Sequence, residues 1–542
     1  MKKGKGLFLV SALLVCSNLS AQFPGGGFGG FGGGFPGGGF PGGGFGGFPD
    51  GGEMPDFGDM GGFGGMMGGT TTYDPTRGTK VEFESSNLPI IVIQTDEKTI
   101  SSKEKTGASM KIINNDGRRN KLTDKANGYD GRIGIKLRGN SSLSFEQKRF
   151  TLETRDSEGK DLDVSLLGMP AESDWVLLAP YNDISMMRDA FAFDLWNRMG
   201  HWGPRSRFCE VVMNGSYIGV YILCEQIKRS SERIDIAKLK SDDDDITGGY
   251  IVRIDPLDEG EKGFQSETPG IMTGGFGGGF GGFGGGARVT WNVYYPKAEN
   301  LTDEQLQYIS DYVNTVEKVI QSDDFADPEN GYAKYISVQS FVDYLIHTEL
   351  SLNADGLKRS TYFYKKKRNA DGTGGKLHAG SVWDYNLAYG NCSFCNANKI
   401  DAWVYEGGET NPTPAMWKRL MEDPVFVAKV KARWKELRKD IISIERINKY
   451  IDDNAELLSE AEKRQYAKYT DLLVAKTATQ QNNGAFGGFG GGFGGGFGMG
   501  GAGGGGAIGM FAAYRVSSYE EEITTLKKWF ADRIAFLDSN WK

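Results

Sequence analysis

Three tracts of glycine and phenylalanine interrupt the chain and limit what can fold. They cover roughly residues 24 to 69, 274 to 286 and 484 to 506, and they repeat short units such as FGGG and FGGF. Glycine loses more conformational entropy on ordering than any other residue, and one Phe every few positions buries too little apolar area to offset that loss. We therefore expect disordered tracts that act as flexible spacers or as sticky segments whose aromatic rings associate.

The first 21 residues have the pattern of a secretory signal peptide. They carry three lysines, an apolar stretch from Leu7 to Val15, and small residues ending at Ala21. We expect cleavage after Ala21 and an exported protein that is periplasmic, secreted or at the cell surface. Lipidation at Cys16 is the weaker alternative, because Val15 is larger than the small residue such a cut requires. No later run approaches the ~20 apolar residues that span a bilayer, so we expect no transmembrane segment.

The chain is acidic, with 62 lysine and arginine residues against 70 aspartate and glutamate residues and a formal net charge of −8. A surface of this sign repels the phosphate backbone of DNA and RNA. We therefore expect no nucleic acid as the main partner.

Cysteine is too scarce for a disulfide-stapled fold, with five residues in the whole chain. Cys392 and Cys395 form one CxxC motif, but the histidines show no spacing that would complete a zinc site. In an exported protein we expect these two thiols to form a short disulfide. Cys209 and Cys224 are expected to be core thiols, since they lie too far out of register to bridge.

Hydrophobic periodicity predicts an α+β fold. Strand signals dominate residues 80 to 255, and the Asn214-Gly215 pair between two apolar runs is a strong hairpin signal. Helical spacing dominates from residue 300 onward, where Thr302 and Gln305 form a capping box.

The periodicity and the tracts together predict four parts. Residues 1–21 are the signal peptide and 22–73 a disordered segment rich in Gly and Phe. The main domain spans 80–440 and carries the insertion at 274–286. A helical C-terminal region, 441–542, carries the insertion at 484–506.

Alternation along the strands assigns polar side chains to faces. If Met213 pairs with Ser216 and Val211 with Ile218, Glu225 lies on the face opposite Cys209. In the same way, Lys148 shares an apolar face with Phe150 and Leu152, where an unpaired ammonium would be costly. Its alternative is a lysine whose head reaches water. Arg138 alternates away from Leu137 and so faces the polar side.

The segment from residue 353 to 391 contains two isolated carboxylates. Asp355 follows a helix-like run and precedes the apolar run TYFY, and Asp384 follows the apolar run SVW. A carboxylate at the end of a buried strand is unfavourable unless a cation or a hydrogen bond satisfies it. Two such residues flanking one hairpin predict a metal and phosphate site.

This segment resembles the spore-coat CotH kinase family, whose members are atypical relatives of protein kinases. Further blocks that carry the resemblance are IGIKLRGNSS at 133–142, QKRFTLE at 147–153, DWVLLAPYNDISMMRD at 174–189, VVMNGSYIGVYILCEQI at 211–227 and WKRLMEDPVFVAKVKARWKELR at 417–438. The resemblance implies a protein-kinase-like fold with a strand-rich N-terminal part and a helical C-terminal part. It also implies transfer of the γ-phosphoryl of ATP to Ser or Thr hydroxyls of protein substrates.

The resemblance also implies roles for single residues. Asp355 would accept the hydroxyl proton and Asp384 would hold Mg²⁺ or Mn²⁺. Lys148 would bind the nucleotide phosphates and pair with Glu225, as a lysine and a glutamate do in kinases. Arg138 either contacts the phosphates or is a solvated strand arginine.

Three positions are less well defined by the resemblance. Ser360 stands where a kinase would place an asparagine on a second metal ion, and Asn386 or Asn391 are alternative sources of that oxygen. Trp383 or Trp175 is expected to stack on the adenine.

A second hypothesis gives the chain no catalytic activity. It would then be a cell-surface adhesin or matrix protein that keeps the family scaffold and associates with itself through the glycine and phenylalanine tracts. The presence of Lys148, Glu225, Asp355 and Asp384 together favours the enzyme, whose substrates would include its own Ser and Thr residues.

Overall fold

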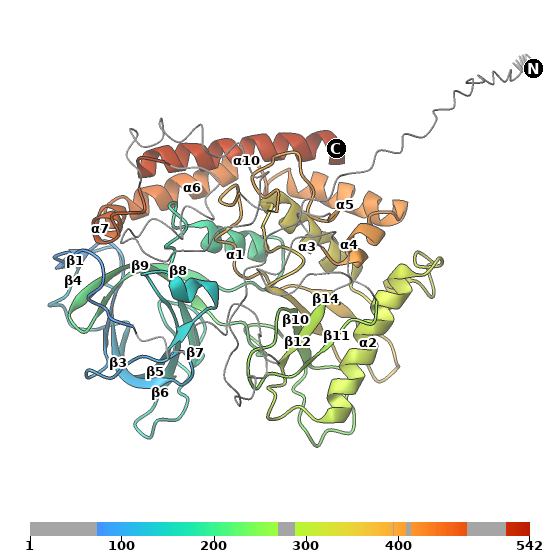
Figure 1. The fold of residues 1–542 in the computed structure, drawn as a ribbon, viewed down its shortest axis with the longest axis horizontal. Helices are drawn as coiled ribbons and strands as arrows, with labels where there is room; N and C mark the ends of the chain where they lie inside the picture. Colours follow the sequence, from blue (N-terminus) through green and yellow to red (C-terminus); the bar gives the residue numbers. More distant parts are fainter. Residues whose placement is uncertain (1–72, 269–287, 394, 408–412, 474–515) are drawn as a thin grey trace, which may run out of the picture. The chain divides into compact units, whose positions relative to one another are not determined.

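The computed structural model of this chain describes residues 73–268, 288–393, 395–407, 413–473 and 516–542. All of them belong to one compact unit, Met60–Lys542. The signal segment and the three glycine and phenylalanine tracts lie outside the described residues. The described residues form a mixed α+β structure (Figure 1).

Seven strands close into a barrel with the order β2-β3-β5-β6-β7-β9-β8. Their alternating apolar side chains, among them Ile135, Phe150 and Trp175, fill the barrel interior. A closed barrel leaves no open strand edge, and its inward face is a packed core. The bounds of the strands are β2 (Ile90–Gln94), β3 (Thr106–Ile113), β5 (Tyr129–Arg138), β6 (Arg149–Arg155), β7 (Asp174–Leu178), β8 (Ser206–Met213) and β9 (Ser216–Glu225).

A β-bulge in the β8-β9 hairpin changes the predicted register. Met213 pairs with Ser216 as expected, but Val211 pairs with Gly219 and not with Ile218. Gly219 has a φ of +106°, which glycine adopts without steric penalty. The extra residue reverses the faces of the rest of β9, so Tyr221 and Leu223 point into the barrel.

A five-stranded sheet, β11-β12-β10-β13-β14, lies beside the barrel (Figure 1). Its neighbouring strands are antiparallel throughout. Two further short strands, β1 (Ser85–Ser86) and β4 (Asn120–Lys121), pair with each other. The bounds of the sheet strands are β10 (Tyr250–Ile254), β11 (Gly263–Gln265), β12 (Thr290–Tyr295), β13 (Thr361–Lys365) and β14 (Leu377–Ala379).

Helices cover one side of the barrel and the sheet. Figure 1 shows α10 and α6 lying alongside each other, with α1 and α3 between them and the strands. The bounds are α1 (Arg188–Arg198), α2 (Asp303–Gln321), α3 (Val338–Ser351), α4 (Ala415–Leu420), α5 (Pro424–Leu437), α6 (Ile444–Leu458), α7 (Ala461–Lys468) and α10 (Tyr519–Trp541), with short 3-10 turns η2 (Ser141–Ser144) and η3 (Tyr332–Lys334). The predicted capping box of Thr302 and Gln305 begins α2. None of the helices in the described ranges is both long and apolar enough to cross a bilayer.

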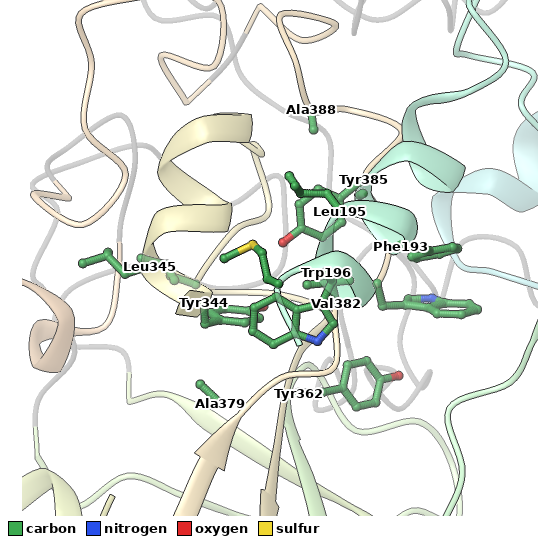
Figure 2. Close-up of a cluster of buried hydrophobic side chains, with 14 of the residues drawn as sticks. Phe193, Leu195, Trp196, Tyr344, Leu345, Tyr362, Ala379, Val382, Tyr385 and Ala388 are labelled. Atoms are coloured by element: carbon green, nitrogen blue, oxygen red, sulfur yellow. The ribbon is translucent and has the colours of Figure 1, made fainter. Parts of the chain in front are cut away.

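Helix α3 is the centre of the helical core, since every residue from 340 to 351 is buried. Figure 2 shows Tyr344 and Leu345 of α3 in one cluster with Phe193 and Trp196 of α1 and with Tyr385. The Trp196 and Tyr344 rings meet edge to face at 5.8 Å. This packing fixes the helix that leads into Asp355 against the segment that carries Asp384.

Two buried ion pairs attach α10 to this core. Arg533 on α10 lies 3.2 Å from the Glu349 carboxylate on α3, and both side chains are fully buried. Glu522 lies 2.7 Å from Arg188 at the start of α1. Burying charges is unfavourable unless they are paired and hydrogen-bonded, so these contacts define one position for α10.

Arg533→Met is expected to lower the free energy of unfolding by about 3–5 kcal/mol, because Glu349 would remain buried without its cation. Glu349→Gln in the same chain is expected to restore part of the loss. The control is Arg446→Met at a surface ion pair with Asp440, for which we expect a loss of about 1 kcal/mol or less. Urea denaturation measures all variants, and equal losses for Arg533→Met and Arg446→Met would contradict the role of the buried pair.

His347 of α3 makes the core sensitive to acid. Its Nε2 lies 3.0 Å from the Ala192 carbonyl and its Nδ1 lies 3.1 Å from the Tyr385 hydroxyl. Burial lowers the pKa of His347 to about 4, so the folded state holds it neutral. Since the unfolded pKa is about 6.5, its stabilisation is complete above pH 6.5 and is lost as the pH falls toward 4.

His347→Gln is expected to be less stable than the wild type at pH 7, with a difference that shrinks by up to about 3 kcal/mol between pH 6.5 and pH 4. The variant cannot take up a proton at this position, whereas the unfolded wild type can. Unfolding free energies measured across this range check the prediction. Parallel stability curves for the two proteins would contradict it.

Candidate active site

Asp384 lies on an irregular segment after β14, not at the end of a strand. The apolar run SVW at 381–383, expected to be strand-like, forms no strand, and β14 ends at Ala379. Asp384 has a φ of +64°, which is unfavourable for a residue with a side chain. Its side chain remains 29 % exposed. Strained residues of this kind cluster at functional sites because the surrounding contacts hold them in place.

A buried arginine holds the Asp384 carboxylate. Arg149 of β6 donates from Nη1 to Asp384 Oδ1 at 2.7 Å. Its Nη2 lies 3.9 Å from Asp189 Oδ2 at the start of α1. The Arg149 and Asp189 side chains are 8 % and 4 % exposed, so this cation lies between two carboxylates in a nearly dry environment.

Asp189 also fixes the backbone next to Asp384. It accepts a hydrogen bond from the Tyr385 amide at 2.6 Å. Burial raises the pKa of Asp189, whereas Arg149 lowers it. The neighbouring Arg188 donates to the Ala388 carbonyl at 3.1 Å, so the start of α1 holds this segment at two points.

Lys148 and Glu225, expected to pair at the site, do not meet. The apolar face that Lys148 shares with Phe150 is the interior of the closed barrel, and the Lys148 ammonium donates to the Leu143 and Phe145 carbonyls there. Burial lowers the pKa of Lys148 to about 8. Glu225 accepts from Arg205 at 2.8 Å and lies 3.7 Å from Arg233.

This difference follows from the register of the barrel, because Glu225 pairs with Trp175 and Trp175 with Leu152, four residues along β6 from Lys148. Alternation along β6 correctly placed Lys148 and Arg149 on opposite faces. It could not show that the apolar face lines the interior of a closed seven-stranded barrel. The outward face of β6, with Arg149, is the one directed at Asp384. The sequence could have assigned Arg149 to the outward face, because it directly precedes Phe150 on the strand and so points to the opposite side.

Asp355 lies in a tight turn after α3. The turn contains Leu357 and Ser360 at φ values of +66° and +46°. Gly356 has no room for a side chain, because a Cβ there would lie 2.6 Å from Thr348 Cγ2. The chain thus turns within a few residues and leaves Asp355 half-buried between α3 and β13.

The structure brings Asp355 and Asp384 together. Asn353 links them, since its Nδ2 donates to the Asp384 carbonyl at 3.3 Å and its Oδ1 accepts from the Asp355 amide at 3.2 Å. Burial raises the pKa of Asp355, and the Asp384 charge raises it further, whereas Lys358 and Arg359 lower it. Sequence reasoning missed Asn353, although it stands two residues before Asp355.

A third carboxylate, Asp255, lies near the first two. It follows β10, and the pairing of Ile254 with Thr361 places it opposite Ser360. Burial raises the pKa of Asp255 to about 6; Arg253 and Arg359 lower it, and Asp384 and Asp355 raise it. The run GGYIVRID ends on Asp255. The sequence could therefore have identified this residue as an acidic side chain that follows an apolar strand.

The polar residues expected to assist with metal have separate positions. The Asn386 side chain donates to Asn182 Oδ1 at 2.9 Å, and the Asn391 side chain donates to the Asn182 and Asn386 carbonyls at 2.7 Å. Ser360 is half-buried at the end of the Asp355 turn. The two asparagine side chains thus hold the loop through their N–H groups. The Asn386 side-chain oxygen takes no part in these hydrogen bonds.

The donor chemistry of the site fits Mg²⁺. Carboxylate and amide oxygens are its preferred protein ligands, and two neighbouring carboxylates favour a divalent cation between them. Among the described residues, no group of three or more His, Cys, Asp or Glu side chains is arranged as a metal centre.

Arg138 and Trp383 contact each other. The Arg138 guanidinium lies 4.9 Å from the centre of the Trp383 ring, and Phe193 stacks on the same indole at 5.7 Å. Trp383 is only 6 % exposed, so its ring has little free surface for a base. Trp175 is fully buried in the barrel interior and cannot stack on a ligand there.

The cysteines differ in part from expectation. Cys209 and Cys224 are buried free thiols, as predicted. Cys392 and Cys395 are not joined to each other, so the expected disulfide is not formed. The Lys358 ammonium instead donates to Cys395 Sγ at 3.0 Å.

Two hollows in the structure lie away from this site. One is lined by residues that include Thr268 and Glu317, and the other by residues that include Tyr405 and Lys418. Neither lining contains Asp355 or Asp384. The carboxylate cluster remains the candidate active site because of its chemistry, since neither hollow combines paired acids with a buried cation.

A family model described as CotH kinase protein matches residues 135–537. No match was found among curated proteins. The matched range is most of the chain and includes β6, α1, both site carboxylates and almost all of α10. The chain therefore belongs to the CotH kinase family.

Proposed function

We propose that this protein is an exported, protein-kinase-like phosphotransferase that transfers the γ-phosphoryl of ATP to Ser or Thr hydroxyls of protein substrates, its own included. One observation carries the proposal. Asp355 and Asp384 belong to different segments, yet the Asp384 charge acts on Asp355 while Asp384 itself binds the buried cation Arg149. A proton acceptor and a metal-binding carboxylate at one point are the two acidic groups that phosphoryl transfer requires.

Asp384 is the residue that would hold Mg²⁺ or Mn²⁺, with Asn386 and Ser360 as possible further oxygen ligands. When bound, the metal neutralises charge on the nucleotide phosphates. Arg149 orients the Asp384 carboxylate, and Asp189 holds Arg149 from the other side. We propose the pair of Arg149 and Asp189 in the role expected of Lys148 and Glu225.

Arg138 extends this cationic surface toward the phosphates. The register of β5 and β6 pairs Arg138 directly with Arg149, so two positive side chains share one face. Like charges directly opposite each other on a sheet are unfavourable without an anion. Arg149 is neutralised by carboxylates, whereas the described contacts of Arg138 are the Trp383 ring and a 3.5 Å contact to Thr151 Oγ1.

Asp355 is the proposed general base. Burial and the Asp384 charge raise its pKa, which makes the carboxylate a better proton acceptor than an exposed aspartate. It would take the proton from the attacking Ser or Thr oxygen. The Asn353 link keeps Asp355 close to Asp384 while this proton moves.

Export rests on the signal-peptide pattern of residues 1–21. An exported kinase needs nucleotide outside the cytoplasm, so direct nucleotide binding is the first property to test. The adhesin hypothesis does not require a buried arginine between two acids beside a third half-buried carboxylate. The enzyme explains these charges, and we prefer it.

Asp384→Asn is expected to abolish metal-dependent ATP binding, because it removes the charge that holds the cation and keeps the shape of the side chain. A thermal shift titration with ATP and Mg²⁺ or Mn²⁺ measures this. The wild type should gain about 2.7 kcal/mol at a nucleotide concentration 100 times its dissociation constant. Asp453→Asn on the exposed face of α6 is the control, and an undiminished gain in Asp384→Asn would remove Asp384 from the site.

Asp355→Asn is expected to keep nucleotide binding and to lose phosphoryl transfer by a factor of at least ~10², because the amide cannot accept the proton. Radiolabel transfer to the protein itself and to a general acceptor such as casein measures turnover, and calorimetry measures binding. Asp311→Asn on the surface of α2 is the control. If binding and transfer fall together, Asp355 is a ligand and not the base.

A further inference from the structure

Arg359 has no ionic partner, although it lies among carboxylates. It is half-buried, and within the described residues its guanidinium makes no hydrogen bond or ion pair. The other arginines near the site differ, since Arg149 bonds Asp384 and Arg253 bonds Glu261. The Arg359 guanidinium is therefore free to bind an anion that enters the site.

The turn after α3 holds the Arg359 backbone beside Asp355. The Arg359 amide donates to the Asp355 carbonyl at 2.9 Å, which closes the tight turn between these residues. The intervening Lys358 is directed elsewhere, to Cys395 Sγ.

The charge of Arg359 acts on two of the three site carboxylates. It lowers the pKa of Asp355 and also that of Asp255, in both cases against the dominant effect of burial. Among the described residues, no ion pair joins this guanidinium to either acid, so its charge remains available to an anion.

We infer that Arg359 is a catalytic residue that binds the phosphoryl group during its transfer. The inference rests on the proposed function. The bond from phosphorus to the ADP oxygen breaks, a bond from the acceptor hydroxyl oxygen to phosphorus forms, and the hydroxyl proton goes to Asp355. Arg359 donates N–H hydrogen bonds to the oxygens of the phosphoryl group and neutralises part of their charge.

A phosphoryl group fits this position better than an acidic side chain of the protein acceptor. The hydroxyl that gives its proton to Asp355 lies next to the phosphorus it attacks, so a cation one turn from Asp355 reaches the transferred group. An acidic side chain elsewhere on the acceptor would be bound by an exposed cation outside this turn. Arg359 is only half-exposed.

The test compares Arg359→Met and Arg359→Lys with Arg368→Met. Arg368 is exposed beyond the opposite end of β13 and takes no part in the site. Calorimetry measures binding of Mg²⁺ with ADP and with a non-hydrolysable ATP analogue, and phosphate release without acceptor measures hydrolysis. Thermal midpoints show that each variant is folded, which we expect because the Arg359 side chain has no structural partner.

Arg359→Met is expected to weaken binding of the ATP analogue by about tenfold or more and to leave ADP binding nearly unchanged. Hydrolysis and transfer should fall together by about 10². Arg359→Lys should lie between the wild type and Arg359→Met, because it keeps the charge and loses the planar fork. Arg368→Met should match the wild type.

Other results would overturn the inference. Unchanged hydrolysis with a raised KM for the protein acceptor would assign Arg359 to an acidic group of the acceptor. Equal weakening of ADP and the analogue would place it on phosphates that remain after transfer. Wild-type behaviour of Arg359→Met, together with lost binding in Asp384→Asn, rejects this inference alone, whereas a wild type that binds neither nucleotide rejects the proposed function as well.

Discussion

The contact of Arg149 with Asp384 and Asp189 is the interaction on which the rest of the site depends. One buried cation joins the outer face of the barrel, the start of α1 and the segment after β14. Without it, two acids would lie close together in a nearly dry environment, and their repulsion would separate these elements. Because Arg149 compensates Asp384 only in part, a half-exposed carboxylate remains available to a metal ion.

Buried charges on the helices hold the segments that carry the two site carboxylates. Arg188, adjacent to Asp189, holds the carbonyls that follow Asp384 and is itself held by Glu522 of α10. Arg533 of the same helix pairs with Glu349 of α3, the helix that leads into Asp355. The last helix of the chain therefore supports both carboxylates, although it follows a long glycine-rich segment in the sequence.

Much of the fold could be predicted from local patterns, and the errors share a cause. The α+β composition, the Asn214-Gly215 hairpin and the capping box of α2 follow from turn chemistry and periodicity, which act within a few residues. The register of β9 was wrong because a single bulge at Gly219 reverses every later face. The pairing of Lys148 with Glu225 was wrong because alternation shows which residues share a face but not the register between strands, which places Glu225 level with Leu152.

By itself, the sequence determined the alternation of the strands, the ends of several helices, and two isolated acids after apolar runs. It also supplied the family resemblance, now supported over residues 135–537. Only the tertiary structure decided which cation meets Asp384, that Asn353 links the two acids, and that Asp255 and Arg359 join them. The physical reason is that charge satisfaction depends on distance and burial, and both are set by elements far apart in the chain.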